Sequence, residues 1–179
     1  MARAYNSGVD GLRDRIRPPV VQALRRTIEG RREAERVADE VCEAVDEAPD
    51  GAEPRLRLRV AAALEQRARG AAGEEFDKDW AGSLLLAALK ALRTSQPGGH
   101  RLLVRLYDRP EGAAPLTPEQ LAQRLSLPPT EVARSLDEGR FELKSLFLRE
   151  IAATVDDPAL VADEVDRLMP YARAAFATA

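Results

Sequence analysis

Apolar positions between residues 116 and 151 recur at spacings of three and four, which is the period of an amphipathic helix. The stretch predicts two helices joined by a tight turn. Thr117 can cap the first helix with its hydroxyl, Pro118 suits the first helical position, and Gln120 stands where a capping box needs Glu or Gln. The Ser-Leu-Pro-Pro run at 126–129 ends this helix, because proline disfavours helical geometry in the residue before it.

The second predicted helix is longer, and Thr130 can cap it. Its apolar stripe contains Val132, Leu136, Leu143, Leu146, Phe147 and Ile151, with Gly139 between them. Its other side carries Glu131, Ala133, Arg134, Ser135, Asp137, Glu138, Arg140, Phe141, Glu142 and Lys144. Two capped helices in this order predict a helix-turn-helix, whose second helix lies in the major groove in DNA-binding proteins. An ordinary helical hairpin that only packs is the alternative.

The prediction of which residues bind nucleic acid depends on the exposed side of this second helix. We expect Arg134, Ser135, Arg140 and Lys144 to contact DNA. Four acids lie among three bases on this side, and carboxylates oppose the counterion release that drives phosphate binding. The pattern therefore predicts the fold of a DNA-binding motif with a weakly basic surface.

Helical periodicity continues through the rest of the chain, and no segment alternates as a strand would. Helices are expected over 9–28, 31–48, 53–69 and 76–94. In the second of them we expect the inward positions Ala34, Val37, Ala38, Val41 and Val45, and in the fourth we expect Trp80 to anchor the core. The run 96–99 is expected to break the fourth helix, with helical periodicity resuming over 100–108, and 109–115 is expected to be a loop. A terminal helix is expected after Asp156-Asp157-Pro158, with Val161, Val165, Leu168 and Ala172 on its inner side. The fold class is therefore all-α.

The Gly-Ala-Ala-Gly-Glu-Glu run at 70–75 is small and polar, which predicts a linker. We expect a helical domain over 1–69 and a second domain over 76–179. Arg55, Arg57 and Arg59 lie two apart, so they should fan around their helix instead of forming one patch.

The remaining composition excludes several classes of function. With one cysteine and one histidine in 179 residues, no disulfide or zinc constellation is available. Cys42 is expected in the core, and His100 in a loop or on the surface. No phosphate loop, nucleophile elbow or metalloprotease motif is present, so we predict no catalytic residues, no cofactor and no enzyme activity. The chain has no apolar run of membrane-spanning length and no signal peptide, which favours the cytoplasm and no membrane partner.

Two motifs connect the chain to a known family. The first is Phe-Asp-Lys-Asp-Trp at 76–80, and the second is Arg-Glu-Ile-Ala-Ala-Thr-Val-Asp-Asp-Pro at 149–158, on either side of the predicted helix-turn-helix. With them, residues 76–168 resemble the C-terminal half of extracytoplasmic-function (ECF) sigma factors of bacterial RNA polymerase. More faintly, Glu33-Ala34-Glu35 and Glu40-Val41 resemble sigma region 2.

The resemblance implies a transcription initiation protein that binds core RNA polymerase through the β′ clamp helices and the β flap and directs it to promoter DNA. It implies that Glu33 and Glu40 lie on a polymerase-binding surface. Several positions depart from the family pattern. Arg36, Asp39 and Cys42 replace the family's Asp, Gln and Phe, Arg57 is near an expected Trp, and Asp137 and Glu138 stand where His and Arg are expected.

An alternative function uses the same helical body as a protein-protein interaction module that has lost promoter reading. Phe141 is an aromatic outside the apolar stripe and among charged residues, which is typical of an interface anchor. In this alternative Phe141 and Leu148 bind a partner or a protein regulator. A helical oligomerisation domain is a third alternative.

Overall fold

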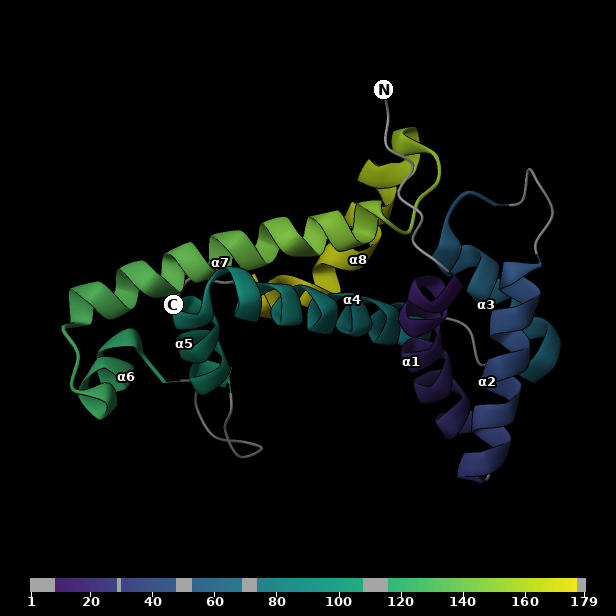
Figure 1. Cartoon of the computed structure of the whole chain (residues 1–179), viewed down its shortest axis with the longest axis horizontal. Coiled ribbons are helices and arrows are strands. Elements are labelled where there is room, and N and C mark those ends of the chain that lie inside the picture. Colours follow the sequence, from purple (N-terminus) through teal and green to yellow (C-terminus); the bar gives the residue numbers. More distant parts are fainter. Residues whose placement is uncertain (1–8, 29, 48–52, 69–73, 108–115, 177–179) are drawn as a thin grey trace. The chain divides into compact units, whose positions relative to one another are not determined.

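The structure is a computed structural model that describes residues 9–28, 30–47, 53–68, 74–107 and 116–176. Within these ranges the regular secondary structure is helical and no strand forms, which confirms the all-α class (Figure 1). The helices are α1 (Val9–Thr27), α2 (Arg31–Asp46), α3 (Leu56–Ala68), α4 (Glu74–Ser95), α5 (Pro97–Tyr107), α6 (Pro118–Leu125), α7 (Pro129–Ala152), the 3-10 helix η1 (Pro158–Leu160) and α8 (Val161–Phe176). No helix in the described ranges is long and apolar enough to cross a membrane.

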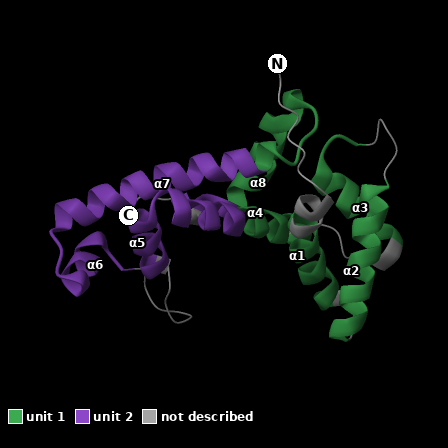
Figure 2. Ribbon diagram, in the orientation of Figure 1, with its two compact units in different colours: residues 1–84, 151–171 green, residues 85–150, 172–179 purple. Residues whose placement is uncertain are grey.

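The chain divides into two compact units (Figure 2). Unit 1 contains residues 1–84 and 151–171, and unit 2 contains residues 85–150 and 172–179. The boundary therefore falls inside α4, and the chain returns to unit 1 at Ile151, in the last turn of α7. Of the predicted linker at 70–75, Glu74 and Glu75 lie in α4, and residues 70–73 lie outside the described ranges. The predicted domains 1–69 and 76–179 stay a prediction.

The core of unit 1 follows the predicted apolar stripes. All five inward positions predicted for α2 are buried, namely Ala34, Val37, Ala38, Val41 and Val45, and Cys42 is buried beside them. In α4, Trp80 is only 1% exposed and its ring centroid lies 5.8 Å from that of Phe76. Periodicity predicted the stripe of α2 because burying one apolar stripe is what stabilises a short helix in a protein.

The predicted break at 96–99 is mostly wrong. α4 continues to Ser95 and α5 begins at Pro97, so Gln96 alone separates the two helices, and both glycines lie within α5. Pro97 fits this place because a proline at the first helical position lacks only an N–H that would be unpaired anyway. His100 accordingly lies in a helix, half-buried, and not in a loop. The predicted loop at 109–115 lies outside the described ranges.

The C-terminal helix begins where the sequence predicted. The Asp157 carboxylate accepts a hydrogen bond of 2.9 Å from the Ala159 N–H and caps η1, which leads directly into α8. Of the predicted inner residues, Leu168 and Ala172 are buried, whereas Val161 and Val165 are half-buried. Glu164 is buried in their place, with 1% exposure, so this helix turns a carboxylate inward.

Candidate nucleic-acid interface

The start of α6 has the capping box that its sequence predicts. The Gln120 N–H donates to the Thr117 hydroxyl at 3.2 Å, and the Thr117 N–H donates to the Gln120 side-chain oxygen at 2.9 Å. The helix ends at Ser126, whose φ of 54° is left-handed, and the Leu127 N–H then bonds back to the Ala122 carbonyl at 3.0 Å. Residues 126–128 thus form a short, hydrogen-bonded turn into α7.

α7 begins two residues earlier than expected, at Pro129 instead of Glu131. Pro129 takes the first helical position, so Thr130 lies inside the first turn and the prediction that Thr130 caps the helix is wrong. A proline is favoured at that position because its φ is already close to the helical value. The predicted stripe is otherwise buried, including Leu136 and Phe147 at 0% exposure, and Leu146 is half-buried.

Two glycines set the distance between α5 and α7. A Cβ atom at Gly99 would lie 3.1 Å from the Gly139 Cα, and a Cβ at Gly139 would lie 3.2 Å from the Gly99 Cα. The two backbones are therefore in direct contact, which only residues without a side chain allow. This contact holds the first half of α7 beside α5.

Three of the four predicted DNA-binding residues have accessible side chains. Arg134 and Lys144 are exposed and Ser135 is half-buried, but Arg140 is only 6% exposed. The placement of Arg140 on the exposed side is wrong, because residue 140 lies four after Leu136 and three before Leu143 and so shares their buried side. Its Nη1 is 3.6 Å from the Asp137 carboxylate.

A cavity of about 340 Å³ opens among α5, the end of α6 and the first turns of α7. The sequence analysis missed its two bases, Arg101 and Arg105, which are exposed and lie four apart on α5. Across the cavity are Ser135 and Glu131 of α7. The spacing of the two arginines in an amphipathic helix was the signal that could have predicted a shared face. Unit 2 thus has more basic surface next to α7 than α7 supplies alone.

The predicted partner-binding residues lie in both units. In α7, Phe141 is 75% exposed and Leu148 is half-buried. In α2, Arg36 bridges the two predicted carboxylates, with its Nη2 2.5 Å from Glu33 and its Nη1 in contact with Glu40. The hydrogen bond from Arg36 lowers the pKa of Glu33, so that carboxylate stays ionised.

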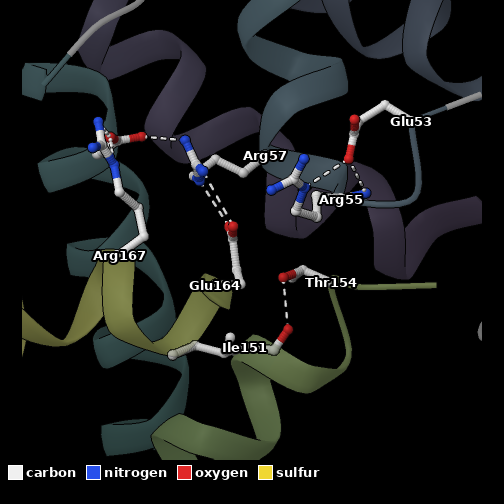
Figure 3. Close-up of polar contacts among 8 residues, drawn as sticks. Glu53, Arg55, Arg57, Ile151, Thr154, Glu164 and Arg167 are labelled. Carbon is white, nitrogen blue, oxygen red and sulfur yellow. Dashed lines mark hydrogen bonds and ion pairs between the residues drawn. The ribbon is translucent and has the colours of Figure 1, made fainter. Parts of the chain in front are cut away.

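A buried ion-pair network in unit 1 was not predicted (Figure 3). The Arg57 guanidinium makes a two-point contact with Glu164, at 2.7 and 3.1 Å, and its third nitrogen lies 2.5 Å from Asp77. Arg167 pairs with the same Asp77 at 2.6 Å. Arg57 and Asp77 have side chains that are 8% and 3% exposed. Each charge has an opposite partner, as burial in a protein interior requires.

Backbone hydrogen bonds bring the segment after α7 to the start of α3 as well. The Leu56 N–H donates to the Thr154 carbonyl at 2.9 Å, and the Asp156 N–H donates to the Pro54 carbonyl at 2.8 Å. Between these bonds, Arg55 and Val155 form an isolated antiparallel bridge. Residues about 100 positions apart in the sequence are thus paired within unit 1.

A scan against protein-family models finds no match, and neither does a search of curated proteins or of solved structures.

Proposed function

We propose that this chain is a sigma-factor-like transcription initiation protein, which binds core RNA polymerase and directs it to promoter DNA through a helix-turn-helix formed by α6 and α7. The proposal rests on the resemblance of residues 76–168 to ECF sigma factors and on one structural observation. That observation is the capped helix α6, joined by a three-residue turn to α7, whose first turns carry the exposed Arg134.

Charge around α7 supports a role in DNA binding. On α7, the exposed bases Arg134, Lys144 and Arg149 equal the exposed acids Glu131, Asp137 and Glu138 in number. α5 adds two exposed arginines at the cavity that Ser135 lines. In helix-turn-helix complexes the second helix reads base edges, and bases on neighbouring elements bind phosphates and fix its orientation. We assign base reading to Arg134 and phosphate binding to the α5 arginines.

These two roles predict different effects on DNA binding. Replacing Arg101 and Arg105 together by Ala should weaken binding to all duplexes alike and lower the slope of log K against log salt by about 2, because about two counterions fewer are released. Arg134→Ala should instead reduce sequence preference. This is measured by letting the chain, together with polymerase, select duplexes from a random pool and comparing the selected sequences. Fluorescence anisotropy at several salt concentrations measures the slope.

Lys90 and Arg93 supply the control, since both are exposed bases of unit 2 on α4, outside the cavity lining. Replacing both by Ala changes the net charge equally and should leave the salt slope nearly unaltered. An equal loss in this control would mean that net charge, and not the cavity, governs binding.

A protein-interaction module that has lost promoter reading is the second candidate. The observation in its favour is Phe141, which is 75% exposed and has a large apolar surface to bury against a partner. The burial of Arg140 also removes a base from the proposed reading surface. Phe141→Ala should then lower polymerase affinity at least tenfold in a pull-down titration. Leu86→Ala is the matched control, because Leu86 is a 62% exposed residue of α4; equal effects of the two substitutions would rule out Phe141 as an anchor.

A further inference from the structure

The segment that follows α7 is acidic, and it lies on a basic part of unit 1. Residues 151–168 contain five acids and one base, a formal charge of −4. The stretch from Pro54 to Ala68 contains four arginines and one acid, a formal charge of +3. We define residues 151–168 as the acidic segment and Arg55, Arg57 and Arg59 as the basic cluster.

The acidic segment reaches each arginine of the basic cluster. Glu164 holds Arg57, and Asp156 lies 3.2 Å from Arg59. Arg55 bonds to Glu53, and Glu164 and Asp163 also raise its pKa by their charge. The expectation that these arginines fan apart without forming one patch therefore missed a common partner: one acidic segment faces all three.

The contacts resemble those that arginines make with phosphate. A guanidinium binds a carboxylate and a phosphate in the same way, with two parallel N–H groups directed at two oxygens. Glu164 occupies this position on Arg57, at 2.7 and 3.1 Å. The Nε of Arg59 is buried without a hydrogen-bond partner among the described atoms, so this arginine has donor capacity that Asp156 does not use.

The acidic segment is held at its ends by the buried apolar side chains Ile151, Val155 and Leu168, and between them chiefly by charge. From Asp156 to Arg167 the sole buried side chain is Glu164, and the nearest buried apolar side chains are Val155 before this stretch and Leu168 after it. Little apolar surface would be exposed if the stretch left α3, and the ion pairs are sensitive to a competing anion. Such a segment can be displaced without unfolding the apolar core of unit 1.

We propose that the acidic segment is an autoinhibitory strap, which covers the basic cluster of α3 and is displaced by the phosphates of a nucleic acid. The strap and the nucleic acid compete for the same guanidinium groups. This inference does not depend on DNA reading by α7, because every residue in it belongs to unit 1.

The test removes two charges of the strap while its shape is kept. Asp156→Asn with Glu164→Gln is measured in a background carrying Arg134→Ala and Lys144→Ala, so that α7 contributes little to binding. We expect a labelled 20-base-pair duplex of mixed sequence to bind at least tenfold more tightly at 100 mM salt, since about two competing charges are removed. Asp166→Asn with Asp46→Asn is the control of equal charge change, because both residues are exposed and the acids that pair with the basic cluster are others. Equal gains in the two double variants would overturn the proposal.

A measurement on the unaltered protein protects the test against a variant that fails to fold. Saturating duplex should speed hydrogen exchange at the Leu56 and Asp156 amides, whose hydrogen bonds join α3 to the strap. Unchanged or slower exchange at both amides would contradict displacement of the strap. Poly-glutamate is tested as a second ligand. If it speeds exchange at these two amides as much as the duplex does, the assignment of the competing ligand to nucleic acid is overturned.

Discussion

At the scale of single residues, the contact between Gly99 and Gly139 allows a direct test of how α5 and α7 pack. Gly139→Ala would gain about 1 kcal/mol of helix propensity. The added Cβ would also meet the Gly99 backbone at 3.2 Å and the Leu103 side chain at 3.4 Å. The two helix backbones cannot separate without loosening the buried Leu103, and overpacking costs about 1–3 kcal/mol. We predict net destabilisation by about 1 kcal/mol in urea denaturation.

Gly82→Ala is the control for Gly139→Ala. Gly82 is an exposed residue of α4, and an added Cβ there meets no atom within 4 Å. It should therefore show the propensity gain alone and stabilise the protein by about 0.5–1 kcal/mol. Stabilisation by both substitutions would mean that α5 and α7 are further apart than described.

Arg140 is a buried residue whose replacement should not destabilise the protein. Its side chain is buried, its Nε has no hydrogen-bond partner among the described atoms, and the carboxylate of Asp137 is 3.6 Å away and mostly exposed. Replacing a poorly paired buried charge by an apolar residue of similar size is often neutral or stabilising. Arg140→Met should leave the free energy of unfolding unchanged or increase it, and should leave DNA affinity within twofold. A decrease of more than about 2 kcal/mol in the free energy of unfolding, measured by thermal denaturation, would show that the Arg140 guanidinium is well paired in the folded protein.

At the scale of elements, the two helix starts of α6 and α7 predict unequal effects for the same substitution. Thr117→Ala removes the hydroxyl that accepts from Gln120, and loss of such a cap costs about 1 kcal/mol. Thr130→Ala should change the free energy of unfolding by less than about 0.5 kcal/mol, since Thr130 is exposed inside the first turn of α7. Chemical denaturation of both variants measures the difference. Equal costs would place the start of α7 at Thr130, as its sequence first indicated.

The elements also show what a sequence can predict. The stripe of α2 and the capping box of α6 were predicted because both depend on residues within a few positions of one another. The burial of Arg57 and Glu164 could not be predicted this way, since each is buried only because the other, 107 residues away, pairs with it. The run at 96–99 misled for a related reason: Gly99 is buried within a helix because Gly139 lies against it. The shared face of Arg101 and Arg105 could have been predicted from the sequence, because the two residues lie four apart on one helix.

At the scale of the whole molecule, unit 1 is built from two distant parts of the chain, and Arg57 joins them. Arg57→Ala would leave Glu164, 1% exposed, without its guanidinium, and breaking a buried pair in this way costs about 3–5 kcal/mol. Trp80 is the single tryptophan and lies in unit 1, so its fluorescence during urea denaturation reports the loss. Arg36→Ala, which breaks an exposed pair on α2, should change the urea midpoint far less than Arg57→Ala does. Similar costs for the two would contradict the buried network.

The central claim is that this helical chain binds core RNA polymerase as a sigma factor does. The most direct test mixes the purified full chain with core polymerase from the same organism and determines the mass of the complex by light scattering after gel filtration. We predict a gain of one 19.6 kDa copy for each core enzyme at micromolar concentration. If the two elute separately, while a known sigma factor binds the same preparation, the sigma-like function is contradicted.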